Sequence, residues 1–359
     1  MESEAIDFLL DLLHTPSPTG FEASGQRRWA AYLRDRGIAV DSDAYGNAWG
    51  TVEGSDPEAP VLLLEAHADE IGYMVRHITD DGFLRVDRIG GSDWINARGR
   101  RLVFHGDKGE VTGVVGNTAI HLRDRKDGEK GPEIHELYVD VGASTADDVR
   151  ALGLRVGHPA VYADGAERFG ENRIVGRALD NRIGGFIIAR VLTELRGGTK
   201  KPEGGVLALN AVQEEIGGHG ARMAAHRLRP DVCVVLDVTH ATDTPGIDHA
   251  RHGNVKLGGG PSLTHGTVNH PGVVRRLLDC AAEAGIPIQH EASSRSTMTD
   301  ADSIFNVGTG IPTALVSLPL RYMHSVVEMA DFQDVEQVVA LLTAFARSIR
   351  AGDRFTVEI

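Results

Sequence analysis

Two adjacent glutamates, Glu214 and Glu215, follow an apolar run in residues 205–221, GVLALNAVQEEIGGHGA. The run is typical of a strand buried on both faces, and the glycines that follow indicate a turn. In open α/β sheets, ligands bind just beyond the carboxyl ends of the strands. Neighbouring side chains at a strand end point in different directions. One glutamate could therefore bind a metal while the other carries a proton.

Other potential metal ligands stand at the ends of expected strands or at the start of an expected helix. Such a residue on its own is usually a cap or a turn residue. Counted together with the glutamate pair, five such positions in one sheet carry a histidine or a carboxylate, which is difficult to explain as capping. So much negative charge in one place requires a cation. These residues are His67 and Asp69 in AHADEIG, Asp180 in RALDNRIGG, Asp237 in VVLDVTH and His324 in LRYMHSVVE.

The types of ligand restrict the cation and its chemistry. Nitrogen and oxygen donors without thiolate fit Zn²⁺, Co²⁺ or Mn²⁺ in a hydrolytic site. The number of carboxylates suggests two ions bridged by one aspartate. In hydrolases, two such ions lie about 3.5–4 Å apart, and together they polarise a carbonyl and lower the pKa of a bound water to roughly 7. A carboxylate outside the ligand set can pass the proton of that water to a leaving amine. Asp69 is placed to orient His67.

The elements that must position these residues alternate between strands and helices. Apolar runs at 60–67, 232–237, 286–290 and 312–318 predict strands, with a further strand before Glu214. Helical patterns separate them, so we expect an α/β fold with a mostly parallel sheet and helices on both faces. The expected helices cover 22–36, 183–195, the residues from 220, those after Pro271, and 332–350.

Residues 73–164 have a different sequence pattern. Their segments are short, rich in β-formers and punctuated by glycine, which predicts a small barrel or sandwich inserted into the α/β domain. We therefore expect a catalytic domain formed by residues 1–72 and 165–359, and an inserted β-rich domain formed by residues 73–164.

Composition excludes several classes of protein. A formal charge of −14 argues against binding to nucleic acid or to an anionic membrane. The two cysteines, Cys233 and Cys280, form no C-x-x-C pair and sit in apolar surroundings, so we expect buried thiols in a reducing compartment. The N-terminal residues predict an amphipathic helix and not a signal peptide. No apolar run is long enough to cross a bilayer, and we expect a cytoplasmic protein.

Five segments, in this order along the chain, resemble those of the TET-type di-zinc aminopeptidases, metallopeptidase family 42, which includes glutamyl and deblocking aminopeptidases. The resemblance implies a di-zinc exopeptidase fold with an inserted barrel-like dimerisation domain. It also implies metal-dependent removal of N-terminal residues from short peptides, and homo-oligomers in which dimers form a tetrahedral dodecamer. The segments are AHADEIGYMV, ALDNRIGG, QEEIGGHGA, DVTHATDTPG and MHSVVE.

The resemblance also implies a role for each candidate residue. Two divalent metal ions per subunit are expected, with Zn²⁺ as the expected metal and Co²⁺ or Mn²⁺ as alternatives. One residue, Asp180, would bridge them. The ligand sets would be His67, Asp180 and Asp237 for one ion, and Asp180, Glu215 and His324 for the other.

Two further residues would act without binding metal. Glu214 would be the general acid/base, and Asp69 would orient His67. The family also has a cis peptide bond after its bridging aspartate, so one is expected between Asp180 and Asn181.

Two other functions remain open. A di-metal amidohydrolase or deacylase acting on an N-acylated small metabolite would use the same ligands in the same order. A catalytically silent scaffold that uses the β-rich insert for assembly would need none of them.

Overall fold

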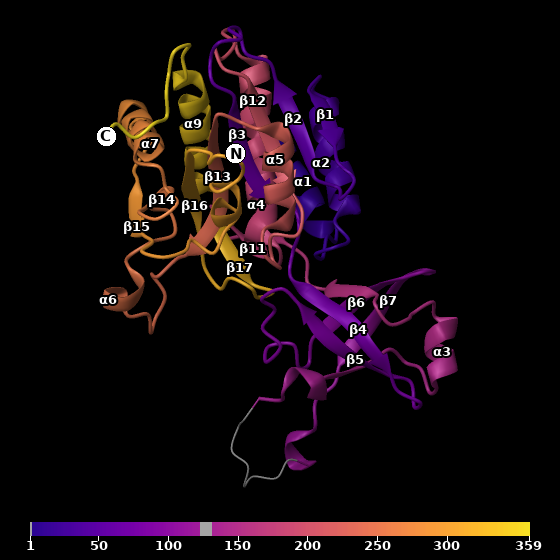
Figure 1. The fold of residues 1–359 in the computed structure, drawn as a ribbon. Coiled ribbons are helices and arrows are strands. Elements are labelled where there is room, and N and C mark those ends of the chain that lie inside the picture. The colour runs from indigo at the N-terminus through magenta and orange to yellow at the C-terminus, as the bar shows by residue number, and fades with distance from the viewer. Residues whose placement is uncertain (1, 123–130) are drawn as a thin grey trace.

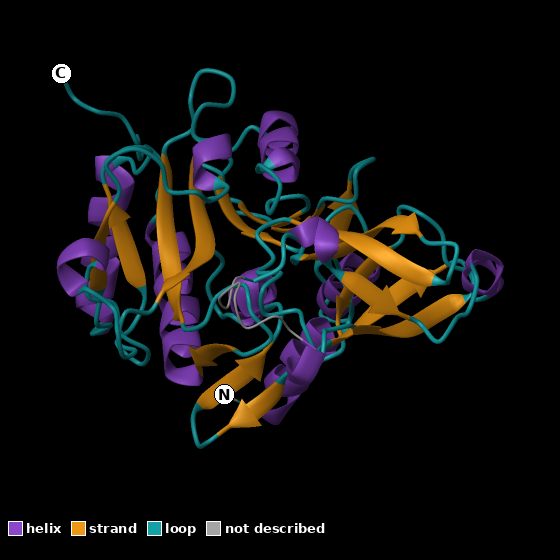
Figure 2. Ribbon diagram, turned by 90° about the horizontal axis from the view of Figure 1, so that it is seen from below, coloured by secondary structure: helices purple, strands orange, loops and turns teal. Residues whose placement is uncertain are grey.

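The computed structural model describes residues 2–122 and 131–359. It contains an eight-stranded sheet with helices on both faces and a closed six-stranded antiparallel barrel. The barrel lies to one side of the sheet. Both ends of the chain lie in the part of the molecule that contains the sheet, away from the barrel (Figures 1 and 2). This arrangement confirms the predicted fold class.

The large sheet has a parallel centre with antiparallel additions at its edges. The centre is formed by β12, β3, β13 and β16, each parallel to its neighbour. At one edge β1 and β2 are antiparallel, and at the other β14 is antiparallel to β16 but parallel to β15. In spatial order the strands are β1 (Ala39–Ser42), β2 (Ala48–Val52), β12 (Val206–Ala211), β3 (Leu62–His67), β13 (Val232–His240), β16 (Thr313–Leu320), β14 (Ser262–His265) and β15 (Gln289–Ala292).

Helices cover both faces of this sheet. One face packs against α4 and α9 around the largest apolar core, and α1, α2 and α7 complete that layer. The other face packs against α5 and α8 around a smaller core that includes Trp49 and Leu63. No helix of the described chain is both long and apolar enough to cross a membrane. The helices are α1 (Ser3–His14), α2 (Ala23–Arg34), α3 (Ala146–Ala151), α4 (Leu179–Gly197), α5 (His219–Leu228), α6 (His249–His252), α7 (Pro271–Ala284), α8 (Ala301–Ile304) and α9 (Phe332–Ser348).

Sequence patterns located the central strands better than the edges. The strands expected at 60–67, 232–237 and 312–318 are present as β3, β13 and β16. The strand expected at 286–290 begins later, at Gln289, and β14 was not predicted. Both are four-residue strands near the edge, where the apolar run that identifies a buried strand is missing.

The barrel has its own core, centred on Tyr73, Leu84, Phe104 and Val139. Alternate side chains of its strands point inward, as expected for a small closed barrel filled by side chains. A short third sheet of β10 (Glu167–Phe169), β11 (Arg173–Gly176) and β17 (Glu328–Asp331) follows the barrel in the chain. The barrel strands, in spatial order, are β4 (Gly72–Ile78), β5 (Phe83–Ile89), β8 (Tyr138–Asp140), β7 (Gly109–Val115), β6 (Arg101–Gly106) and β9 (Pro159–Tyr162).

A buried ion network joins the barrel to the sheet. Glu70, just before β4, is 2% exposed and pairs with Arg177, just after β11. It also accepts a hydrogen bond from the Ser17 backbone nitrogen at 2.8 Å, and it lies 3.6 Å from Arg182 Nη1. Arg182 donates in turn to the Leu12 carbonyl at the end of α1. One carboxylate thus ties together the outgoing chain, the returning chain and the first helix.

We expect Glu70→Gln to lower the free energy of unfolding by about 3–5 kcal/mol, because it leaves two buried guanidinium groups without their counter-charge. Denaturant titration followed by circular dichroism measures the loss. The exposed Glu53→Gln is the matched control and should change stability by less than about 0.5 kcal/mol. A similarly small effect of Glu70→Gln would contradict the structural role assigned to this network.

Candidate dinuclear metal site

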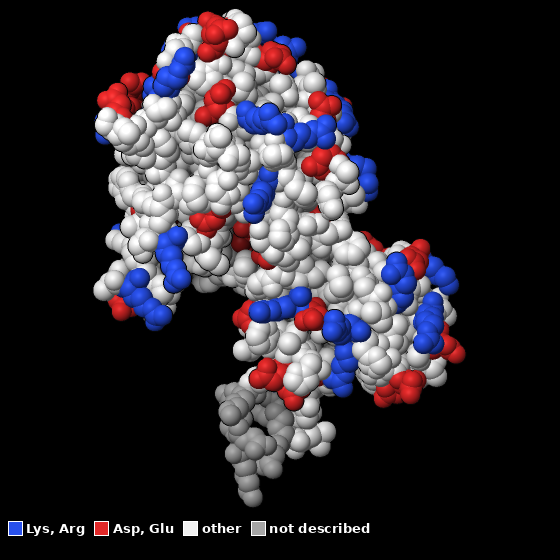
Figure 3. Space-filling model, in the orientation of Figure 1, with Lys and Arg blue, Asp and Glu red and all other residues white. Residues whose placement is uncertain are grey.

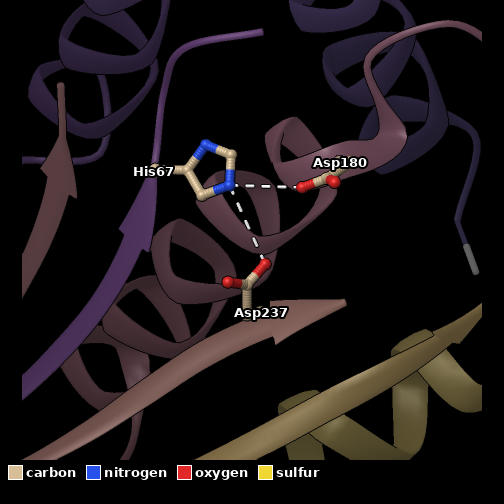
Figure 4. A group of neighbouring side chains, drawn as sticks. All are labelled: His67, Asp180 and Asp237. Atoms are coloured by element: carbon tan, nitrogen blue, oxygen red, sulfur yellow. Dashed lines mark ion pairs between the residues drawn. The ribbon is translucent and has the colours of Figure 1, made fainter. Parts of the chain in front are cut away.

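Three predicted ligands converge at the carboxyl edge of the sheet. His67 Nε2 lies 3.2 Å from Asp180 Oδ1 and 3.8 Å from Asp237 Oδ1. Figure 4 shows the imidazole and both carboxylates pointing toward one another from different elements. One ligand atom from each residue lies within 4.8 Å of the others, so the three could hold one metal ion.

A second group of three shares Asp180 with the first. His324 Nε2 lies 3.2 Å from Asp180 Oδ2 and 3.6 Å from Glu215 Oε2. Their ligand atoms also lie within 4.8 Å of one another. Because the two oxygens of Asp180 face different groups, its carboxylate is placed to bridge two ions.

The parallel register explains why residues so far apart in the sequence meet here. His67 is the last residue of β3 and pairs with Ala211, the last residue of β12, so the loop that carries Glu214 and Glu215 begins beside it. Asp237 lies in β13, the other neighbour of β3. These side chains reach one edge because parallel strands end on the same side.

The remaining two candidate ligands come from irregular backbone. Asp180 lies in the distorted first turn of α4, and the peptide bond between Asp180 and Asn181 is cis, as predicted. His324 lies between β16 and β17 with a φ of 61°. The carboxylate of Glu328, at the start of β17, accepts hydrogen bonds from the backbone nitrogens of both Asp180 and His324, at 3.2 and 2.8 Å. Glu328 therefore fixes the spacing of the two chain segments.

Asp69 lies behind the ligands and binds both sides of the site. Its Oδ1 lies 3.5 Å from His67 Nδ1 and accepts a hydrogen bond from the Glu214 backbone nitrogen at 3.0 Å. Its Oδ2 accepts from the Thr19 hydroxyl at 2.7 Å and from the Glu215 backbone nitrogen at 3.2 Å. Asp69 is completely buried, so it is placed to orient the imidazole and the acidic loop together.

We expect Asp69→Asn to lower metal affinity or activity by about 10–100-fold, the usual effect of removing a partner that orients a ligand. An amide keeps the shape of the side chain but loses the charge and two acceptor positions. Metal titration by calorimetry and steady-state kinetics measure the loss. Thr19→Val is the milder matched variant, since it removes only one hydrogen bond to Asp69. Unchanged affinity and activity in Asp69→Asn would contradict the orienting role.

The buried carboxyl groups of the site lack positive charge that a bound cation would supply. Burial raises the pKa of Glu214 to about 9 and that of Asp237 to about 7, and neighbouring carboxylates add to both shifts although His67 opposes them. Burial likewise raises the pKa of Glu215 well above its ordinary value, and its Oε1 is buried with no hydrogen-bond partner among the residues that the structure describes. Among the carboxylates of the two ligand groups, Asp180 differs: contacts with His324 and His67 outweigh its burial and lower its pKa. Divalent cations would supply the positive charge that these groups lack.

The five residues of the two ligand groups, together with Glu214, line one cavity of about 740 Å³. The barrel domain contributes to its wall. The carbonyl of Gly91, just beyond β5, lies 3.2 Å from His324 Nδ1. A methyl group at Gly91 would lie only 2.4 Å from that nitrogen, so the close approach requires glycine. The face drawn in Figure 3 shows acidic and basic side chains interspersed over both parts of the molecule.

Sequence reasoning missed two buried carboxyl groups behind Glu214. Glu65 and Asp300 are 0% and 1% exposed, and apart from the contact between their two carboxyl groups none of their four oxygens has a hydrogen-bond partner in the described residues. Burial raises the pKa of Glu65 to about 8. The charged residue within VLLLEAH was a usable signal, since a glutamate in a buried strand needs an explanation. Asp300 could not be found, because only the fold brings it to β3.

This donor set, on a parallel sheet with an inserted barrel, defines a metallo-aminopeptidase type of protein, and comparison identifies the family. The M42 glutamyl aminopeptidase family matches residues 46–341, and the chain belongs to it. It is therefore a peptidase. The closed barrel beside the mostly parallel sheet agrees with the fold that the resemblance implied.

Individual relatives match nearly the whole chain. A lysyl aminopeptidase of Pyrococcus furiosus is 34% identical over 97% of this chain and 98% of its own. An aminopeptidase structure from Desulfurococcus kamchatkensis has a TM-score of 0.89 at 32% identity, covering 96% and 95% of the two chains. The Pyrococcus horikoshii TET1 peptidase, described as able to assemble into a tetrahedron or a large octahedral shell, has a TM-score of 0.84 at 28% identity, covering 95% and 99%.

Proposed function

We propose that the protein is a dinuclear metal-dependent aminopeptidase that removes N-terminal residues from short peptides. The observation that carries the proposal is the pair of three-residue groups that share Asp180, with Glu214 beside them in the same cavity. His67, Asp180 and Asp237 would hold one ion, and Asp180, Glu215 and His324 the other. Membership of the M42 family supports the reaction class.

Each side chain has a distinct task in this proposal. Bound ions would supply Lewis acidity toward the scissile carbonyl and an acidified water. Glu214, whose Oε2 lies 3.8 Å from His67 Nε2, accepts the proton of the attacking water on a carboxylate oxygen. It then delivers that proton to the nitrogen of the leaving amine. Asp69 keeps the imidazole of His67 aligned throughout.

The donors favour Zn²⁺ as the metal, with Co²⁺ or Mn²⁺ able to occupy the same groups. Each group combines one imidazole with two carboxylates, and the only cysteines, Cys233 and Cys280, are free and buried outside both groups. Imidazole and carboxylate without thiolate suit these three ions. Metal analysis of protein loaded with each ion, beside its specific activity, identifies the one that supports turnover best.

The closest rival is a deacylase that acts on N-acylated metabolites with the same ligands. A panel of aminoacyl-p-nitroanilides and N-acetyl amino acids, run on metal-loaded protein before and after chelation, separates the two. We expect chelator-sensitive hydrolysis of the free-amine substrates. Faster hydrolysis of N-acetyl amino acids would favour the deacylase, and a metal content below about one ion per chain would favour a silent scaffold.

We infer that the β-rich domain, residues 73–164, pairs two copies and that dimers build a tetrahedral dodecamer. The inference is supported by the named assembly of the horikoshii relative, which covers almost the whole chain. Native mass measurement of the intact protein tests it, and a stable monomer would reject it.

A further inference from the structure

A smaller polar cavity adjoins the candidate active site. Its volume is about 320 Å³, and it lies between the ends of β13 and β15 and residues 293–299. It shares four wall residues with the larger cavity, among them Thr239 and Thr297. Thr239 follows the metal-ligand candidate Asp237 by two residues in β13. A substituent of a molecule bound at the metal site can therefore extend past Thr239 into this second cavity.

The carboxylate of Glu291 lines this smaller cavity. Glu291 belongs to β15, and its Oε1 accepts a hydrogen bond from the Thr239 hydroxyl at 2.7 Å. Its Oε2 is buried, and no donor reaches it within residues 2–122 and 131–359. An ionised carboxylate can accept about four hydrogen bonds. One buried oxygen beside the active site therefore lacks the donor that it requires.

The rest of the lining suits a long side chain that ends in a cation. Val238 and Leu315 are buried and give the cavity an apolar wall. Hydroxyl groups from the threonines and serines around Glu291 are additional acceptors. Lysine and arginine side chains combine an apolar stem with a charged head that needs such acceptors.

The cavity also contains one cation of its own, Arg295, which would favour an acidic ligand instead. Arg295 is exposed to solvent, and it donates no hydrogen bond to the buried Oε2 of Glu291 in the described chain. A charge in water attracts a ligand weakly, whereas a charge in a desolvated cavity attracts it strongly. The buried oxygen of Glu291 therefore favours a cationic ligand more than the exposed Arg295 favours an anionic one.

We propose that this cavity receives the side chain of the substrate's N-terminal residue and that Glu291 selects lysine or arginine there. The proposal rests on the aminopeptidase function proposed above and specifies its substrate class. The family is described as that of the glutamyl aminopeptidase, whereas the relative from Pyrococcus furiosus is a lysyl aminopeptidase. Membership of the family therefore does not determine which N-terminal residue is preferred.

Metal-loaded enzyme is assayed with lysyl, norleucyl, leucyl and glutamyl p-nitroanilides, because norleucine differs from lysine mainly by lacking the ammonium group. The wild type should prefer lysyl over norleucyl substrate in kcat/KM by at least about tenfold. Glu291→Gln should lower kcat/KM for lysyl substrate by about 10- to 100-fold and change that for norleucyl substrate by less than about threefold. Glu291→Lys should shift the preference toward glutamyl substrate. The exposed Glu283→Gln is the matched control.

The outcomes separate this proposal from the one on which it rests. Hydrolysis of leucyl or glutamyl substrate without a preference for lysyl would overturn the role of Glu291 alone. Equal losses on lysyl and norleucyl substrates in Glu291→Gln, with metal content retained, would also overturn it. Failure to hydrolyse any free-amine substrate would overturn the aminopeptidase function and this inference together.

Discussion

Replacing Glu214 with glutamine should lower kcat by about 10²–10⁴-fold, the usual contribution of a general acid/base. Glutamine keeps the shape of the side chain but cannot accept a proton from water and return it to an amine. Since Glu214 belongs to neither three-residue ligand group, the metal content of the variant should match that of the wild type. Steady-state hydrolysis of an aminoacyl-p-nitroanilide, beside metal analysis of the same preparation, measures both quantities.

Two comparisons make this result specific to Glu214. Glu58→Gln changes an exposed glutamate and should leave kcat within about twofold of the wild-type value. Glu215→Gln should instead reduce the metal content, because Glu215 belongs to a ligand group. If Glu214→Gln retained both its metal and most of its activity, the assignment of Glu214 as the proton carrier would be wrong.

Replacing Asp180 with asparagine should empty both halves of the metal site and reduce activity to background. Asp180 is common to both ligand groups, and its oxygens lie 3.2 Å from His67 Nε2 and 3.2 Å from His324 Nε2. An amide replaces one of these oxygens by a donor, so it cannot bridge two cations. Mass-spectrometric metal analysis should give less than about one ion per chain, compared with about two in the wild type.

The matched variant is Asp237→Asn, which alters one ligand group and leaves the other intact. It should retain more metal than Asp180→Asn does. Circular dichroism of both variants checks that the fold is unchanged. Retention of about two ions by Asp180→Asn would show that the shared carboxylate is not a bridge.

The parts of the site that could be predicted from the sequence lie directly after buried strands. His67 and Asp237 could be found because an apolar run marks a central strand and its last polar residues mark the ligand edge. The pairing of His324 with Glu215 rested on the family resemblance. Both lie in loops, and no periodic pattern determines how two loops meet.

The residues that sequence reasoning missed act through contacts between segments far apart in the chain. Gly91 comes from the barrel yet approaches His324 across more than two hundred residues. Glu291 lies on a short edge strand with half-buried and exposed side chains, which gives no hydrophobic period to recognise. Their roles follow from close packing between domains and strands, and packing of this kind is a property of the completed fold.

The ion network at Glu70 holds the barrel to the sheet where the connecting segments pass. The barrel extends away from the sheet (Figure 1). Glu70 lies in the segment that leads into the barrel, and it pairs with Arg177 in the segment that returns from it. A small rotation there would move the far end of the barrel by a much larger distance. If barrels join copies, as proposed, the angle at which the Glu70 network holds the barrel to the sheet would contribute to the shape of the assembly. A substitution there could change the number of subunits without altering any residue on the contact surface.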